Sequence, residues 1–483
     1  MRLPLLAGSR ALVASLPDDA VVIRVRPPVD ALTDVGAAVR EALRYPLSGD
    51  PLDRLATRDG KATVVVEPPV LPLPGAPLDP RRIALAAILD ELASLGVAPD
   101  DQTILVAGGL ERRPRREDLD WLLPPAKARD YRGEVVVHDC EAEELVRLET
   151  SLPIATRVHP ALVQSDLVIT LSAAESVLHG GPAVLAGACG PAVARSLEAE
   201  SLLEPRSAPG WALVGAVEEA IAARTPLIAV SLLLDPPRVA RPFAGPVGRR
   251  VLNALPEASR RRVLEAPRRE LGAIAAFAGP PAVAHAEALV RGTALRAVEV
   301  REQLETLVVP IPWFDAHHPR EAPNPITAAA IGLGLAMRLW RDRPPLVPGG
   351  TVVLVHPLSR TIGHGPQAPY RAVLGALRDG QQTGRLAHAE ALAARDRKAI
   401  AAYRAGKAPH PRLPFQDWAS CAPAIAHAGR VIVAGCRDAA VARALGFVPS
   451  HNLATAIEMA IGVAGGGRVG VLDAPPYVPL VPG

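Results

Sequence analysis

The sequence predicts an α/β protein of two domains, each with a mainly parallel sheet flanked by helices. Short stretches rich in valine, isoleucine and leucine alternate with helical stretches, which is typical of doubly wound parallel sheets. The chain has 483 residues, which exceeds the usual length of one domain. The alternation restarts near residue 290, so we expect one domain over 1–288 and another over 289–483. The proline-rich end, 474–483, is expected to drape over the surface.

The individual elements follow from local patterns. Runs of β-branched residues predict strands, and helical periodicity that ends at a glycine predicts helices. The expected strands are 20–26, 62–66, 103–107, 134–138, 167–171, 227–234, 305–309, 351–355, 430–434 and 468–472. The expected helices are 83–95, 116–123, 212–223, a helix containing His285, 326–340 and 454–464.

Composition excludes several classes of protein. Aromatic residues make up 3% and hydrophobic residues 49% of the chain, so the cores must be aliphatic. The net charge is +3 and the arginines are scattered, which argues against nucleic-acid binding. No apolar run predicts a membrane span or a secretory signal, so we expect a cytoplasmic protein. The four cysteines form no CxxC motif, which argues against a zinc knuckle or a redox dithiol.

The stretch 165–196 is the centre of the functional argument. An apolar strand runs into small residues that carry one acid, Glu175, and one imidazole, His179, followed by Gly180 and Gly181. A strand that enters a glycine-rich turn is how α/β proteins build a site at the carboxyl edge of a sheet. The alternative is a tight strand-to-helix connection in which the histidine only caps the turn.

Polar residues also follow the other strands of the first domain. Glu67 follows 62–66, Glu111 comes shortly after 103–107, and His138-Asp139 follows 134–137. Because the carboxyl ends of parallel strands meet at one edge, these residues are expected to converge. The alternative is that sheet edges always carry polar turns.

The second domain offers a loop between His356 and His364. Arg360 lies in this loop, and we expect Arg360 and His364 to contact an anionic ligand. His356 with His364, or Asp315 with His317-His318, are the densest polar clusters, but the spacing dictates no third metal ligand, so any metal site is unknown.

Several of these pieces occur together and in order. They are Ala107-Gly108-Gly109, His138-Asp139, Ser165 to Ile169, Glu175, Gly180 to Gly187, Phe277-Ala278-Gly279 with His285, Gly349 to Val355, Gly363-His364-Gly365 and Gly446-Phe447. On these pieces the chain resembles the nickel-dependent lactate racemase family, as a divergent member. The resemblance implies a lactate racemase-like N-terminal domain over 1–288, a C-terminal domain over 289–483, and an active site in the interdomain cleft.

The resemblance also implies chemistry. The family cofactor is a nickel pincer nucleotide, attached through a lysine and completed by a histidine on the metal. The reaction is hydride abstraction from Cα of a 2-hydroxy acid and its return to either face. Two histidines serve as acid/base groups, and a cation holds the substrate carboxylate. An active protein would therefore be an isomerase.

Most of this apparatus is replaced here. Glu67 falls on the early acidic motif, Glu111 on a family histidine, and Glu175 matches directly. His179 is a neighbouring substitute for a second histidine. The cofactor-binding residues would be Gly180, Gly181 and Glu175, but the family lysine and nickel-ligand histidine are not found, so the cofactor is unknown.

Three hypotheses remain open. The chain is a 2-hydroxy-acid racemase or epimerase with altered residues, or a degenerate member that binds a small anionic ligand or nucleotide, or a different enzyme built around Glu67, Glu111 and His179. All three expect a small-molecule anionic ligand, with neither nucleic acid nor membrane as partner. Substrate and oligomeric state are not disclosed by the sequence.

Overall fold

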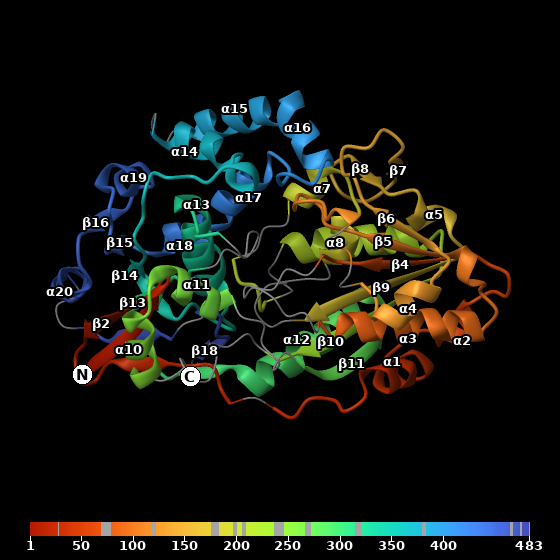
Figure 1. The fold of residues 1–483 in the computed structure, drawn as a ribbon, viewed down its shortest axis with the longest axis horizontal. Helices are drawn as coiled ribbons and strands as arrows, with labels where there is room; N and C mark the ends of the chain where they lie inside the picture. The colour runs from red at the N-terminus through yellow and green to blue at the C-terminus, as the bar shows by residue number, and fades with distance from the viewer. Residues whose placement is uncertain are drawn as a thin grey trace.

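The protein folds into two α/β lobes that lie side by side (Figure 1). The structure is a computed structural model. It describes residues 1–482 apart from 28, 69–78, 117–118, 120–121, 175–182, 197–199, 205–208, 236–245, 266–271, 314–320, 379–382, 464–466 and 474–475. Among the described residues, no helix is long and apolar enough to cross a membrane.

The first lobe is built on a six-stranded sheet in the order β11-β10-β9-β4-β5-β6. All neighbours pair in parallel except β11, which runs antiparallel to β10. The strands are β4 (Ala62–Val66), β5 (Gln102–Val106), β6 (Glu134–Val137), β9 (Leu167–Ala174), β10 (Leu227–Leu234) and β11 (Ala273–Gly279). The chain winds outward from β4 in one direction and from β9 in the other, so the topological switch point lies between these two strands.

Both faces of this sheet are covered, which explains why its strands are apolar throughout. Val64 of β4 packs with Ile88 in the core under α1 and α3, whereas Val65 packs with Leu185 and Val217 on the opposite face. The helices are α1 (Val35–Arg44), α2 (Leu52–Leu55), α3 (Arg81–Ser94), α4 (Pro125–Asp130), α5 (Ala161–Gln164), α6 (Ala183–Gly187), α7 (Pro191–Arg195), α8 (Pro209–Ala222) and α12 (Pro281–Arg296). A short antiparallel pair, β7 (Val146–Leu148) and β8 (Thr156–Val158), lies outside the sheet.

The second lobe is built on another six-stranded sheet, in the order β16-β15-β14-β13-β17-β3, and all its pairs are parallel. The strands are β3 (Val21–Ile23), β13 (Leu304–Pro310), β14 (Leu346–Val355), β15 (Arg430–Ala434), β16 (Val448–Ser450) and β17 (Val469–Leu472). Its helices are α10 (Pro246–Ala254), α11 (Glu257–Glu265), α13 (Pro325–Ala329), α14 (Tyr370–Arg378), α15 (Thr383–Ala393), α16 (Arg397–Arg404), α17 (Leu413–Ser420), α18 (Ala422–His427), α19 (Ala439–Ala444) and α20 (Leu453–Val463).

The N-terminal segment belongs physically to the second lobe. The hairpin of β1 (Arg2–Ala7) and β2 (Arg10–Ser15) packs with α20 over one face of the second sheet, and β3 forms its edge strand. Helices α10 and α11 contact the same hairpin, where Leu6 packs with Leu252 and Leu264. The lobes are therefore not two consecutive stretches of chain. The division into domains at 288/289 stays a prediction, and that position lies inside α12.

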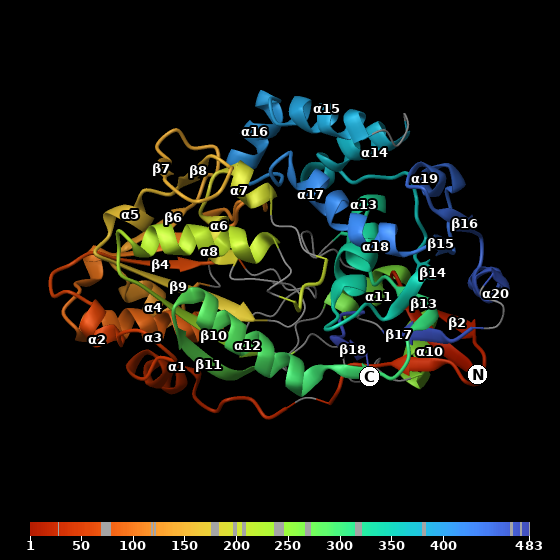
Figure 2. The same cartoon turned by 180° about the vertical axis from the view of Figure 1, so that it is seen from behind.

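Three expected elements differ from the structure. The helix expected over 116–123 is not formed at its described residues, since Leu119, Leu122 and Leu123 lie outside any helix. The helix expected over 326–340 begins as α13 but continues as a π-helical turn over Ala330–Leu335 and a 3₁₀ turn over Ala336–Arg338. The C-terminal end does more than drape, because β18 (Leu480–Pro482) pairs in parallel with β12 (Val298–Val300) and Tyr477 is fully buried. Both termini lie on the second lobe, as the two opposite views show (Figures 1 and 2).

Candidate functional site

The carboxyl edge of the first sheet brings together two of the predicted segments of the first lobe, those that carry Glu67 and Glu111. Glu67 directly follows β4, and Gly108 to Glu111 follow β5 in the adjacent position. The switch point between β4 and β9 opens at this same edge, which is where ligands bind in open α/β sheets. The fold thus places this edge where the sequence predicted it.

Glu67 is buried, with 6% of its surface exposed, and belongs to a carboxylate–guanidinium cluster. The Arg81 guanidinium lies 3.9 Å from Glu67 Oε2 and donates to Asp79 Oδ2 from Nη2 at 2.6 Å and from Nε at 2.9 Å. One cation is therefore shared by two buried carboxylates. Without the cation, both carboxylates would be buried charges with no opposite charge beside them. The contacts of Glu67 in this cluster are structural, and a catalytic role for Glu67 stays a prediction.

Glu111 is half-buried and lies beside the end of β4. A side chain added at Gly108 would have Pro68 at 3.1 Å and the Glu111 Cβ at 3.8 Å. The segments that carry Glu67 and Glu111 therefore meet across Gly108. An acid/base role for Glu111 stays a prediction.

The central motif lies between β9, which ends at Ala174, and α6, which begins at Ala183. Glu175, His179, Gly180 and Gly181 themselves fall outside the described residues. The described end of α6 docks on the end of β5, where Gly109 N donates to Gly187 O at 2.9 Å. A Cβ on Gly187 would stand 2.5 Å from Ala107 O, so only glycine permits this approach.

His138, which follows β6, is a structural histidine. It is 2% exposed, and its Nε2 lies 2.9 Å from Cys189 O, so Nε2 carries the proton and donates. Burial lowers the pKa of His138 to about 4, which keeps the ring neutral at physiological pH.

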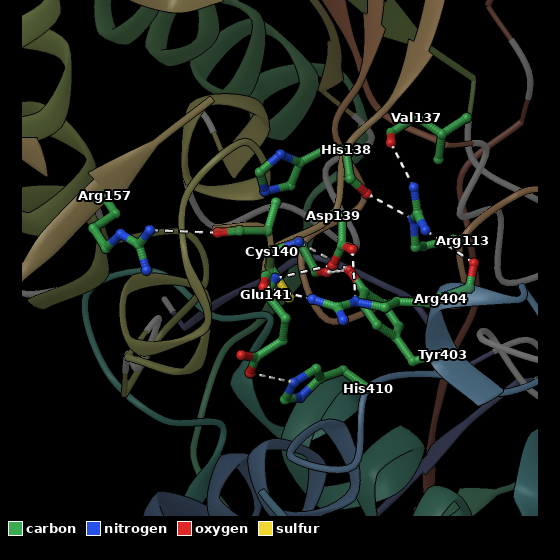
Figure 3. Close-up of polar contacts among 12 residues, drawn as sticks. Arg113, Val137, His138, Asp139, Cys140, Glu141, Arg157, Tyr403, Arg404 and His410 are labelled. Carbon is green, nitrogen blue, oxygen red and sulfur yellow. Dashed lines mark hydrogen bonds and ion pairs between the residues drawn. The ribbon is translucent and has the colours of Figure 1, made fainter. Parts of the chain in front are cut away.

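The two lobes are joined beside this edge by the interlobe junction, which we define as Leu110, Cys140, Glu141, Tyr403 and His410 with their neighbours (Figure 3). The Tyr403 hydroxyl donates to Gly109 O at 2.9 Å and accepts from Cys140 N at 3.3 Å. His410 is fully buried, with Nε2 2.9 Å from Glu141 Oε1 and its backbone N–H donating to Leu110 O.

Arginines reinforce the interlobe junction. Arg404 Nε lies 2.9 Å from Asp139 Oδ2, and Arg113 donates both to Arg404 O at 2.9 Å and to Val137 O at 2.8 Å (Figure 3). Arg195 and Glu390 add an ion pair at 3.0 Å. Apart from Asp139, the side chains of the interlobe junction carry no signal in the sequence, because partners such as Tyr403 and Gly109 are 294 positions apart and no local pattern links them.

The predicted anion-binding residues of the second lobe do not share one cavity. Arg360 is exposed, 4.0 Å from Asp438, and lines a hollow of about 720 Å³ with Arg378 and Arg443. His364 is also exposed, with Nδ1 3.3 Å from Arg371 Nη2. His356, in contrast, is 6% exposed and lines a different cavity. Anion binding by Arg360 and His364 stays a prediction.

All four lysines are described, and none of them belongs to a segment that directly follows a strand of the first sheet. Lys61 directly precedes β4, at the opposite edge of the sheet. Lys127 of α4 pairs with Asp90. Lys398 and Lys407 are exposed on and after α16 in the second lobe. Among the residues that the structure describes, no group of three or more His, Cys, Asp and Glu side chains is arranged to hold a metal ion.

Comparison with known proteins finds one family model, which matches part of the chain. The family described as "Lactate racemase N-terminal domain" matches residues 8–180, which include β4, β5, β6 and β9. Over these residues the chain is similar to the lactate racemase N-terminal domain.

The fold of the lactate racemase extends over the rest of the chain. The structure of the lactate racemase apoprotein from Thermoanaerobacterium thermosaccharolyticum is similar, with a TM-score of 0.63 and 16% identity, and the match covers 100% of both chains. A Thermotoga maritima protein solved by the Northeast Structural Genomics Consortium matches with a TM-score of 0.49 and 12% identity, covering 94% of this chain and 99% of that one. No curated protein matches the sequence.

Proposed function

We propose that this chain is a lactate racemase-like protein that binds a small organic anion without a lysine-anchored nickel cofactor. The positions of the four lysines carry the proposal. The family lysine follows the glycine pair closely in sequence, whereas here Pro182 and Ala183 follow Gly180 and Gly181. Of the four lysines of the chain, Lys127 pairs with Asp90 and the other three are exposed. The residues present therefore do not fit the cofactor attachment that the family resemblance implies.

The histidines support the same conclusion. The segment 195–204, where the resemblance places the nickel-ligand histidine, contains no histidine. His138 lies at the sheet edge, but its Nε2 proton is committed to Cys189 O. A metal ligand needs a free imidazole lone pair on an accessible nitrogen, and the buried ring of His138 does not offer one.

A retained racemase or epimerase reaction on a 2-hydroxy acid is the second candidate. The match of residues 8–180 to the racemase N-terminal domain favours it. Chemistry would then have to rely on groups such as Glu67 and Glu111, with the protein acting as an isomerase.

Intact-mass spectrometry tests for the tethered cofactor, and a lactate racemisation assay separates the two candidates. The protein is produced in cells that make the nickel pincer nucleotide, beside a lactate racemase that keeps the tethering lysine as the positive control. We expect the control to gain the mass of the cofactor and this chain to keep its unmodified mass, with no stoichiometric nickel and no racemisation of D- or L-lactate. A cofactor adduct, or nickel bound one per chain, would refute the proposal.

A further inference from the structure

The carboxyl edge of the second sheet bounds a cavity of about 1090 Å³. Its walls include residues that directly follow three strands: His356 after β14, Gly435 after β15 and His451 after β16. The tip of the β1–β2 hairpin, Gly8 to Arg10, closes another side. We propose that this cavity binds a phosphorylated small molecule, with its phosphate at the N-terminus of α20.

The N-terminus of α20 supplies the first part of a phosphate site. Asn452 caps the helix, because its Oδ1 accepts from Thr455 N at 2.7 Å. Leu453 and Ala454 also line the cavity, and amides in the first turn of a helix have no acceptor within the helix. A helix of 11 residues adds a favourable dipole for an anion at this end.

His356 supplies an independent indication of a ligand. Its side chain lines the same cavity and is more than nine-tenths buried, yet neither of its ring nitrogens has a hydrogen-bond partner among the described residues. Buried polar groups in folded proteins are nearly always paired. Burial, with the charge of Arg437 nearby, lowers the pKa of His356 to about 4, so the ring stays neutral and offers one donor and one acceptor.

Charge and size specify the class of ligand. Arg10, Arg261 and Arg437 line the cavity against Glu257 and Glu321, an excess of one positive charge. Arg261 is engaged by Glu257 and by the Trp313 ring at 3.9 Å, which leaves Arg10 and Arg437 at the rim. The volume far exceeds that of inorganic phosphate, so the remaining space suits an organic body of about nucleotide size.

Backbone geometry keeps the approach open. Gly435 has φ +79°, which favours glycine, and no atom lies within 4 Å of where its Cβ would stand. A ligand can therefore reach the backbone after β15 without a side chain in its way. This site is separate from the first sheet, so the proposal does not depend on how the cofactor question is resolved.

Isothermal titration calorimetry on the full chain tests the proposal, with adenosine 5′-monophosphate, inorganic phosphate and adenosine as probes. We expect adenosine 5′-monophosphate to bind most tightly, phosphate more weakly, and adenosine least. Arg437→Gln, at an exposed position, should lower the affinity for the two phosphate-bearing probes about tenfold, because a charge-assisted hydrogen bond is lost. Arg395→Gln, at an exposed arginine that lines neither this cavity nor the hollow of Arg360, is the matched control.

His356→Asn is the second variant and should weaken adenosine 5′-monophosphate by a similar factor. If His356→Asn unfolds the lobe, the affinity measured for Arg437→Gln still tests the proposed site. Failure of all three probes to bind at millimolar concentration would overturn the proposal. Binding that Arg437→Gln leaves unchanged would overturn it as well, because the ligand would then lie elsewhere.

Discussion

Two buried histidines make the stability of the fold depend on pH. His138 of the first lobe and His356 of the second are each less than one-tenth exposed, and burial lowers the pKa of both to about 4. An unfolded chain titrates its histidines near pH 6.5. Each ring therefore takes up a proton more readily in the unfolded than in the folded state as the pH falls below about 6.5.

This difference predicts loss of stability under mild acid. Stability should be full above about pH 6.5 and should fall as the pH approaches 4, with each histidine costing about 2 kcal/mol between pH 7 and pH 5. In His138→Gln, whose amide can still donate to Cys189 O, thermal melting should drop less between these pH values than in the unaltered chain. His388→Gln, at an exposed position on α15, should melt like the unaltered chain at both. An equal acid-induced drop in His138→Gln would contradict the assignment of a buried neutral ring.

At the scale of elements, one buried hydroxyl of α16 contributes to joining the lobes, beside the bonds of Arg404. Tyr403 is fully buried, and its oxygen pairs with Gly109 O and Cys140 N, two backbone groups of the first lobe. Tyr403→Phe would leave both groups buried without this partner. We expect a loss of about 1–3 kcal/mol in the free energy of unfolding, measured by urea denaturation.

Tyr45→Phe is the matched control, since Tyr45 is 74% exposed, and it should change stability by less than about 0.5 kcal/mol. An equal effect of the two substitutions would show that the interlobe junction contributes nothing to stability.

Element prediction succeeded where burial on two faces left a continuous apolar run. Strands such as β4, β10 and β15 were expected at their observed bounds for this reason. The hairpin β1–β2 was missed, because Pro4 and the short turn at Gly8 hide the strand pattern. The helix expected over 326–340 was wrong beyond Ala329. A Cβ at Gly332 would stand 2.5 Å from Leu354, so close packing there needs glycine, which disfavours a regular helix.

The candidate site was predictable in part for a related reason. Residues after parallel strands meet at one edge, so the convergence of the segments carrying Glu67 and Glu111 followed from strand order alone. The cavity of the second lobe was not predictable, because its walls combine the hairpin tip at Gly8 with strand ends hundreds of residues away. Contacts of that span depend on packing of the whole fold and leave no local pattern.

At the scale of the whole molecule, the chain crosses between the lobes more than once. Residues 2–23 complete the second lobe, β4 to β10 form the first, α10 and α11 return to the second, and β11 and α12 return to the first before β12. Such crossings tie the lobes together covalently at several places. The interlobe junction adds a non-covalent tie on the side of α15 and α16 (Figure 2).

This path predicts that a substitution near the N-terminus weakens the C-terminal sheet. Leu5 of β1 is fully buried against Val353, Ile432 and their neighbours, so Leu5→Ala should remove about 2–5 kcal/mol of stability from the second lobe. Hydrogen exchange followed by mass spectrometry should show faster exchange in β13, β14 and β15, with β4, β5 and β9 protected as before. Val13→Ala, at a position 44% exposed on the same hairpin, should leave both sheets protected. Faster exchange confined to the first sheet in Leu5→Ala would contradict the assignment of the N-terminal hairpin to the second lobe.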